Sequence, residues 1–125
     1  VLKLLVDRGC NPVGSKCLIL GFAFKENCPD HRNTKVIDLV HRLQYFRVDV
    51  DVYDPWVSAR EVRREFGLDL MEKLSEDTYD AIVVAVAHTE FVDMGCGGLR
   101  SLGRDGCVIF DVKSVFAKTD VDGRL

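Results

Sequence analysis

The chain has 125 residues, of which 47% are hydrophobic and 30% are charged, and its formal net charge at pH 7 is −3. This size and composition predict a single globular domain with one hydrophobic core. The small negative charge argues against nucleic acid or an anionic membrane as a partner. The longest apolar run, residues 81–87, is too short to span a bilayer, and we expect neither a membrane span nor a signal peptide.

The five cysteines are odd in number, and they include no C-x-x-C pair and no histidine at metal-site spacing. Cys17 and Cys107 begin strand-like runs, where a thiol is usually a small buried apolar group. We therefore expect all five cysteines to be reduced, no metal site, and a cytoplasmic protein.

Residues 1–8 have the pattern of the last turns of a helix, and Gly9 is placed to end it. The sequence begins with Val rather than Met. Together these features predict that the chain is a fragment of a longer protein.

Residues 16–22 form a continuous apolar run, which is typical of a strand buried on both faces of a parallel sheet. Gly21 lets the backbone turn at the end of this run. Asn33 is placed to cap a helix that begins at Thr34. Apolar residues recur in that helix at helical spacing: Val36, Leu39, Val40 and Leu43.

Residues 48–53 have strand character, and Pro55 cannot continue a strand. Ser58 is placed to cap a short helix over residues 59–66, which Gly67 ends. The remaining predicted elements are a brief strand at 68–71, an irregular or helical piece at 72–77, a clear strand at 81–87, a helix beginning at His88, a last strand at 107–110, and a polar tail from 111 with little to bury.

Strands that alternate with helices predict βαβ units and a parallel sheet. Because crossovers are right-handed, we expect an α/β fold, a three-layer Rossmann-like sandwich with a mostly parallel sheet of four or five strands. Ligands of such open sheets bind outside the carboxyl ends of the strands.

Basic residues gather at that edge of the predicted sheet. The first strand leads to Phe24, Lys25 and Arg32, and the last strand leads to Lys113. Two lysines and an arginine at one edge of an acidic protein indicate an anionic ligand such as phosphate. Taken singly, each is more often a solvated side chain or part of a surface ion pair. Their clustering is what favours a binding site.

Other polar residues follow the strands at the same edge, among them Asp54, His88 and Asp111. An aspartate before proline is most often only a turn, and a histidine before Thr89 fits the start of a helix. Both the functional and the structural interpretation stay open for these residues.

The loop after the first strand lacks the G-x-G-x-x-G pattern, because Gly21 is followed by Phe22, Ala23 and Phe24. A dinucleotide turn needs glycines so that the backbone can approach the pyrophosphate closely. The domain is therefore a poor candidate for holding a whole NAD by the usual route.

The stretch at residues 21–34, Gly-Phe-Ala-Phe-Lys-Glu-Asn-Cys-Pro-Asp-His-Arg-Asn-Thr, resembles the signature of the carboxyl-terminal, UDP-binding domain of the UDP-glucose/GDP-mannose dehydrogenase family. Residues 52–55 and 109–113 fall where that family has matching segments. The resemblance covers essentially the whole chain. It implies that residues 1–10 are the end of the family's central connecting helix and that residues 11–125 are the nucleotide-sugar-binding domain.

Members of this family oxidise the C6 alcohol of a nucleotide sugar to a carboxylate with two NAD, through a cysteine-bound intermediate. The resemblance implies that NAD is bound mainly by an amino-terminal domain before residue 1, where the catalytic cysteine also lies. Cys28 is not that cysteine. We therefore expect the fragment to be inactive alone and the parent enzyme to be a homodimer or higher homo-oligomer.

The resemblance also implies roles for individual residues. Phe24 and Lys25 match the pair that contacts the nucleotide sugar, and Arg32 matches the arginine that reaches across the cleft to NAD. Lys113 stands where many members have an arginine in a substrate contact, and an ammonium lacks the bidentate fork of a guanidinium. No catalytic residue is implied within the fragment.

The form of residues 26–30, Glu-Asn-Cys-Pro-Asp, resembles the branch that acts on UDP-N-acetylhexosamines for surface polysaccharide synthesis, whereas the common form has a Thr-Asp-Asp or similar triplet at residues 28–30. We expect residues 24–33 to be mobile or differently placed without the other domains. A non-catalytic nucleotide-binding module stays open as an alternative. A phosphoryl-accepting signalling module is rejected, because it needs an acidic pair for Mg²⁺ where this chain has Phe24 and Lys25.

Overall fold

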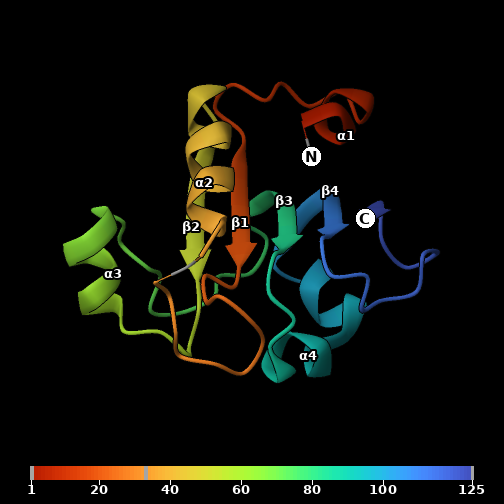
Figure 1. Cartoon of the computed structure of the whole chain (residues 1–125). Coiled ribbons are helices and arrows are strands. Elements are labelled where there is room, and N and C mark those ends of the chain that lie inside the picture. The colour runs from red at the N-terminus through yellow and green to blue at the C-terminus, as the bar shows by residue number, and fades with distance from the viewer. Residues whose placement is uncertain (1, 33, 125) are drawn as a thin grey trace.

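Helices and strands alternate along the chain in the computed structural model, which describes residues 2–32 and 34–124 (Figure 1). The elements are α1 (Leu2–Asp7), β1 (Lys16–Leu20), α2 (Val36–Tyr45), β2 (Asp49–Tyr53), α3 (Ala59–Phe66), β3 (Tyr79–Val84), α4 (Thr89–Arg100), β4 (Gly103–Asp111) and β5 (Gly123–Arg124). The strands form one sheet in the order β2-β1-β3-β4-β5, and every pair is parallel.

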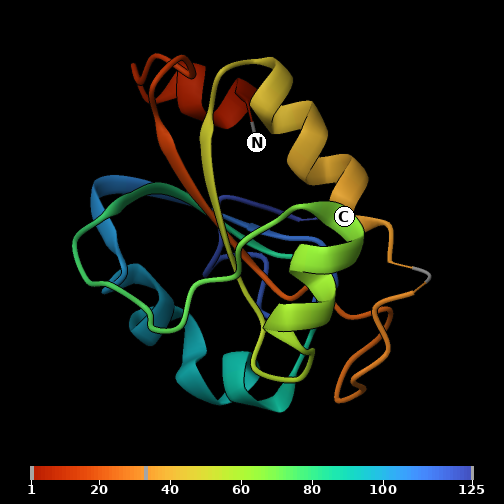
Figure 2. The same ribbon diagram turned by 90° about the vertical axis from the view of Figure 1, so that its left-hand side faces the viewer.

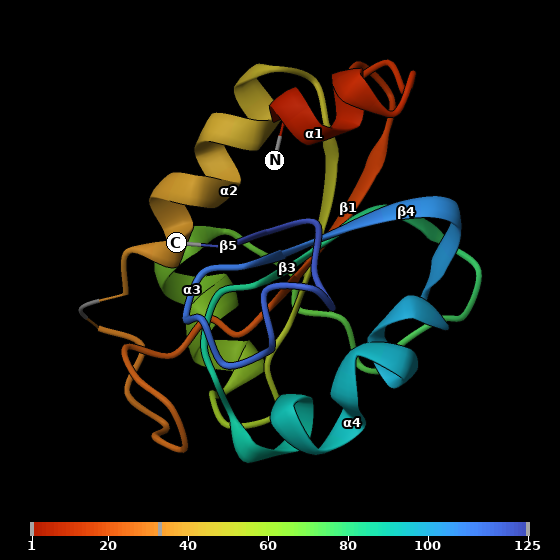
Figure 3. The ribbon, with the colours of Figure 1, turned by 90° about the vertical axis from the view of Figure 1, so that its right-hand side faces the viewer.

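The sheet lies between two layers of helices. Buried side chains of α1, α2 and α3 pack in one cluster with one face of the sheet, and those of α4 pack in a second cluster on the other face. Figure 3 shows α1 and α2 above the strands and α4 below them. The predicted three-layer α/β fold is confirmed, with five strands that are all parallel.

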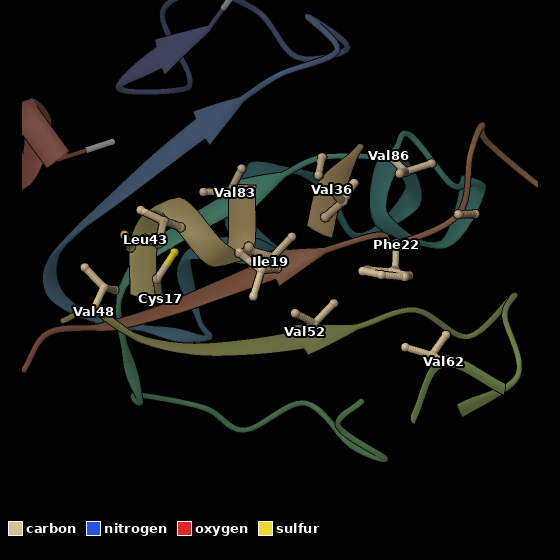
Figure 4. Packing of buried hydrophobic residues seen from close by; sticks show 14 of the residues in the cluster. Cys17, Ile19, Phe22, Val36, Leu43, Val48, Val52, Val62, Val83 and Val86 are labelled. Carbon is tan, nitrogen blue, oxygen red and sulfur yellow. The ribbon is translucent and has the colours of Figure 1, made fainter. Parts of the chain in front are cut away.

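The apolar run of β1 reflects this double covering. Successive residues of a strand point to opposite faces, so Cys17 and Ile19 lie in the first cluster and Leu18 and Leu20 in the second. All four are fully buried. Burying each apolar side chain of this size contributes roughly 1.5–3 kcal/mol. Figure 4 shows the first cluster, where Ile19 and Val83 lie beside α2.

Helix α3 has the predicted bounds because both of its ends are set by local chemistry. The Ser58 hydroxyl accepts a hydrogen bond from the Glu61 N–H at 3.2 Å, and Gly67 adopts a left-handed φ of 66°. Val62 is fully buried beneath the helix, and the ring of Phe66 packs edge-on against Phe22, with centroids 5.3 Å apart.

The predicted strands at 68–71 and 81–87 differ in the structure, whereas the predicted irregular or helical piece at 72–77 is irregular. The predicted strand at 68–71 makes an isolated bridge between Leu70 and Val52 in the described chain. The predicted strand at 81–87 is β3, which leaves the sheet after Val84. The N–H groups of the next two residues donate instead to the Leu20 carbonyl at the end of β1.

The start of α2 also differs from the prediction. The predicted cap Asn33 lies outside the described residues. Helix α2 begins at Val36, two residues later than expected, and the Thr34 hydroxyl accepts a hydrogen bond from the Val36 N–H at 3.1 Å.

The prediction of a polar tail with little to bury is wrong. Strand β4 begins before the predicted strand and ends one residue after it, at Asp111, and β5 pairs with this end. Val121 is buried, and the Asp122 carboxylate accepts a hydrogen bond from the Ile109 N–H at 2.8 Å. A two-residue strand leaves no periodic signal in a sequence, so the sequence does not predict the pairing of β5 with β4.

Helix α1 confirms the predicted helical end. It runs to Asp7, and Gly9 has a left-handed φ of 75°. Leu5 packs into the first cluster, and Arg8 forms an ion pair with Asp122. The two ends of the described chain are therefore joined. Across residues 2–32 and 34–124, none of the helices has the length and apolar character needed to cross a membrane.

Candidate functional site

The segment between β1 and α2, residues 21–35, runs along the carboxyl ends of the strands. Figures 1 and 2 show that this loop lies at that end of the sheet, beside α3. The predicted site residues Phe24, Lys25 and Arg32 all lie on this loop. The position of the loop therefore agrees with the edge that the sequence indicated.

Asp54 holds the first residues of the loop. Its Oδ2 accepts hydrogen bonds from the N–H groups of Phe22 at 2.6 Å and Ala23 at 2.8 Å, and it lies 2.9 Å from His88 Nε2. Its Oδ1 accepts from the Trp56 N–H at 2.7 Å. Burial by itself raises the pKa of this carboxyl, but the hydrogen bonds outweigh burial, and its pKa lies below the ordinary value. The buried carboxylate is thus a support for the loop rather than a ligand group.

His88 joins the middle of the loop to the same carboxylate. The ring is fully buried and stacks on Trp56, with centroids 5.8 Å apart. Its Nδ1 accepts a hydrogen bond from the Asn27 N–H at 2.8 Å. The Asn27 amide also pairs with Thr89 at the start of α4, by one bond of 2.8 Å and one of 2.9 Å. The structural interpretation therefore holds for His88, which is a buried bridge.

Asp111 is buried as well. Its carboxylate accepts hydrogen bonds from the N–H groups of Lys113 at 3.1 Å and Phe116 at 2.8 Å. Like Asp54, it shapes the chain that leaves a strand rather than facing a ligand. The Lys113 side chain itself is exposed.

A cleft of about 340 Å³ opens between the loop, the start of α2 and the segments that follow β3 and β4. Its lining is mostly apolar and carries two basic residues: Ala23, Phe24, Lys35, Val36, Leu39, Ala85, Val86, Val112 and Lys113. The structure thus brings the predicted residues Phe24 and Lys113 together. Phe24 is 51% exposed although the two residues before it, Phe22 and Ala23, are buried, so its ring is available to a ligand.

Lys35 is a candidate binding residue that the sequence reasoning missed. It is the residue immediately before α2, at the loop's end, and it lines the cleft together with Lys113. Its place just before the first apolar position of an edge helix is a signal that could have identified it, because helix amino-termini at this edge attract anions.

Lys25 and Arg32 are not part of the cleft's lining. Lys25 is exposed on the loop. Arg32 is exposed on the α3 side, where its Nε lies 3.2 Å from Asp30 Oδ1. The Arg32 N–H and guanidinium both donate to Asp30 and hold the pKa of that carboxyl below its usual value. The predicted residues therefore form two groups rather than one cluster.

His31 fastens the far end of the loop to α3. It is 5% exposed, with its Nε2 3.2 Å from a Glu65 carboxylate oxygen and its Nδ1 4.0 Å from one of Glu61. Together with Asp30 and Arg32 these residues line a second, more open hollow of about 360 Å³. Its three carboxylates outnumber the Arg32 guanidinium, so the lining of this hollow is less suited to an anion than that of the cleft at Lys35.

The loop does not offer a cradle for a whole dinucleotide. The N–H groups of Phe22 and Ala23 follow Gly21, where a pyrophosphate would be held in a dinucleotide fold, but both donate to Asp54. The described cysteines, Cys28 included, are free thiols, and within the described ranges no group of three or more Cys, His, Asp or Glu could hold a metal ion.

Comparisons with known proteins connect this geometry to one family. The sequence model described as the UDP-glucose/GDP-mannose dehydrogenase family, UDP binding domain, matches residues 18–118. A UDP-N-acetyl-D-glucosamine 6-dehydrogenase of Salmonella typhi is 46% identical over 125 residues, which cover 100% of this chain and 29% of that protein. One of Pseudomonas aeruginosa is 42% identical over 100% of this chain and 30% of its own length.

Solved structures show the same fold. An NDP-N-acetyl-D-galactosaminuronic acid dehydrogenase of Methanosarcina mazei Go1 superposes with a TM-score of 0.82 and 24% identity, over 95% of this chain and 25% of that chain. A UDP-D-ManNAc dehydrogenase of Pyrococcus horikoshii superposes with a TM-score of 0.77 and 22% identity, over 98% of this chain and 28% of that chain. The chain spans less than a third of the length of each of these relatives.

Proposed function

Because the chain belongs to the UDP-glucose/GDP-mannose dehydrogenase family, we propose that it is the nucleotide-sugar-binding domain of an NAD-dependent 6-dehydrogenase. The enzyme oxidises the C6 alcohol of a UDP-N-acetylhexosamine to the uronate, with two NAD, in surface polysaccharide synthesis. The names of the relatives from Salmonella typhi and Pseudomonas aeruginosa support an N-acetylhexosamine rather than glucose. Five free thiols favour a cytoplasmic enzyme.

The observation that carries this proposal is the cleft beside the loop. Lys35 and Lys113 place two ammonium groups on a lining that contains no acidic residue, in a chain of net charge −3. Charge-assisted hydrogen bonds from ammonium groups suit a diphosphate. The half-exposed ring of Phe24 offers an apolar surface for the sugar or the base. Lys25, the next residue, is exposed and adds a third cation outside the lining of the cleft.

Arg32 serves the cofactor rather than the sugar nucleotide in this proposal. Its pairing with Asp30 is exposed, and exposed ion pairs contribute little stability, so the guanidinium is free to exchange partners. A contact from Arg32 to NAD on a facing domain would couple closure of the cleft to cofactor binding. NAD, held mainly by that domain, accepts the hydride.

The proposal also assigns the ends of the chain. We place residues 1–10 at the end of the central connecting helix and residues 11–125 in the carboxyl-terminal domain. The catalytic cysteine and the dinucleotide fold then lie outside this chain, in a parent enzyme that is a homodimer or a higher homo-oligomer. A non-catalytic nucleotide-binding module is the alternative, and the 125 residues by themselves are expected to form no NADH.

The test is calorimetric titration of the protein with UDP-N-acetylglucosamine, UDP-N-acetylgalactosamine, UDP-N-acetylmannosamine and UDP-glucose. One of the N-acetylhexosamines should bind most tightly, and Lys35→Ala and Lys113→Ala should each weaken that binding by roughly ten- to a hundredfold, because a charge-assisted contact is worth about 1.5–3 kcal/mol. Lys73→Ala, an exposed lysine away from the cleft, is the matched control. Equal losses in all three variants, or no binding at all, would refute the assignment.

A further inference from the structure

A chain of polar groups centred on the buried His88 ring connects three distant parts of the sequence. Asp54 follows β2, His88 precedes α4, and Asn27 lies in the loop after β1. His88 Nε2 lies 2.9 Å from Asp54 Oδ2, and the Asn27 N–H donates to His88 Nδ1 at 2.8 Å. His88 and Asp54 are both buried, so water does not compete for the bond between them, whereas Asn27 at the other end of the chain of groups is exposed.

The partners assign the protons of the His88 ring. A backbone N–H can only donate, so Nδ1 must carry the lone pair that accepts from Asn27. Asp54 Oδ2 already accepts from two backbone N–H groups, so it is an acceptor toward Nε2 as well. The ring is therefore neutral, with its proton on Nε2. If the ring were protonated on Nδ1, its N–H would face the Asn27 N–H, and two donors cannot form a hydrogen bond with each other.

One carboxylate consequently holds the loop at two points. Asp54 binds the N–H groups of Phe22 and Ala23 directly, and it binds Asn27 through His88. Only residues 24–26 lie between the two anchors. Asn27 itself adopts a left-handed φ of 54°, so the chain turns sharply at the second anchor. A chain this short has little freedom once both of its ends are fixed.

We propose that His88, as the neutral ring protonated on Nε2, is a positioning residue that sets the placement of Phe24 and Lys25 for the nucleotide sugar, an inference that rests on the proposed function. His88 touches neither substrate nor cofactor. It acts by holding the Asn27 end of the loop at a set distance from the Ala23 end, so that Phe24 lines the cleft and the exposed Lys25 follows it.

Two substitutions separate this role from that of an ordinary core histidine. In His88→Asn the amide oxygen stands near the place of Nδ1 and can accept from the Asn27 N–H, but the donor to Asp54 is lost. In His88→Gln the amide nitrogen stands near the place of Nε2 and can donate to Asp54, but the acceptor for Asn27 is lost. Each variant keeps one bond and leaves a space of similar size.

The proposal predicts that the two variants differ in ligand affinity although they unfold at similar urea concentrations. By calorimetry with UDP-N-acetylglucosamine, His88→Gln should bind at least tenfold more weakly than the unchanged protein, and His88→Asn within about threefold of it. Equal affinities of the two variants, or affinities that simply follow their stabilities, would overturn the proposal.

A ligand-free measurement keeps this test separate from that of the proposed function. A long-range ¹H–¹⁵N spectrum of the unchanged protein should show His88 protonated on Nε2 alone. Amide exchange at residues 24–26 should accelerate in His88→Gln and not in His88→Asn. A proton on Nδ1, or equal exchange in both variants, contradicts the positioning role. If instead no UDP-sugar binds while the amide pattern appears, the proposed function fails and the anchoring of the loop stands.

Discussion

Gly21 packs directly against Val86, and the contact leaves no space for a side chain at position 21. A Cβ there would lie 2.5 Å from the Val86 Cβ and 2.9 Å from its backbone nitrogen, and Gly21 has a φ of 102°. This contact brings the end of β1 against the segment that follows β3. It places the start of the loop beside Val86, which lines the cleft.

Replacement of Gly21 by alanine should therefore destabilise the fold strongly. We expect a loss of about 3 kcal/mol in the free energy of unfolding, since overpacking costs roughly 1–3 kcal/mol and a left-handed backbone costs roughly 1–2 kcal/mol for a residue with a Cβ. Urea unfolding measures it. Gly106→Ala is the matched control, because Gly106 has a φ of 79° but open space around it, and it should lose only about 1 kcal/mol. A similar loss in both variants would show that the contact with Val86 is unimportant.

Stability should depend on pH through Asp54. Its folded-state pKa lies below the ordinary value of 3.8, so its contribution is fully present above that value and is lost as the pH falls through the folded-state pKa. Asp54→Asn should lower the free energy of unfolding at pH 7 by roughly 3 kcal/mol, because the buried hydrogen bonds to the charge are lost.

The difference between this variant and the unchanged protein should shrink below pH 3.8, as measured by urea unfolding at several pH values. Asp69→Asn, which changes an exposed aspartate, should have little effect at any pH. A difference that is constant from pH 7 to pH 3 would show that the charge of Asp54 is not what matters.

The buried thiols should resist modification in the folded protein. Burial raises the pKa of Cys17 to about 12 and that of Cys107 to about 11, so at pH 8 almost no thiolate is present at either. Iodoacetamide labelling followed by peptide mass spectrometry should find Cys28, which is only half-buried, labelled well before both. In urea all three should react alike. Rapid labelling of Cys17 in the folded protein would mean that the sheet face covered by α1, α2 and α3 opens readily.

Lys25 should contribute to ligand binding without contributing to the fold. It is exposed, so Lys25→Ala should leave the urea midpoint unchanged and weaken binding of the preferred UDP-sugar about tenfold, as expected for loss of a contact worth about 1.4 kcal/mol. Lys118 is another exposed lysine, in the chain that follows β4, and Lys118→Ala is the control that should leave the affinity unchanged. Unchanged affinity of Lys25→Ala would mean that the loop's role has been misassigned.

The predicted fold and the observed one agree where the signals are local. Strand β1 is a continuous apolar run because both faces of the sheet are buried, and the apolar residues of α2 recur at helical spacing because one face of that helix is buried. Ser58 and Gly67 set the ends of α3 through hydrogen bonds to residues a few positions away. The motif at residues 21–34 was likewise readable, and it led to the family that the comparisons support.

The features of the fold and the site that the sequence does not predict depend on residues that lie far apart in the chain. Strand β5 is too short for a pattern, and it exists because Asp122 and Val121 find partners on β4 and beneath it. Lys35 became a candidate only when the fold brought it to the same cleft as Lys113.

The amino-acid sequence alone determined that this protein is an α/β domain with a cationic loop at the carboxyl edge of a parallel sheet. It could do so because the periods of strands and helices and the residues that form turns are set within short stretches of chain. Only the tertiary structure decided what Asp54 and His88 do, since they lie 34 residues apart and nothing local pairs them. A charged or polar residue at a sheet edge suits a ligand or a support equally well. Burial and the hydrogen-bond partners decide between the two, and both arise only when the chain has folded.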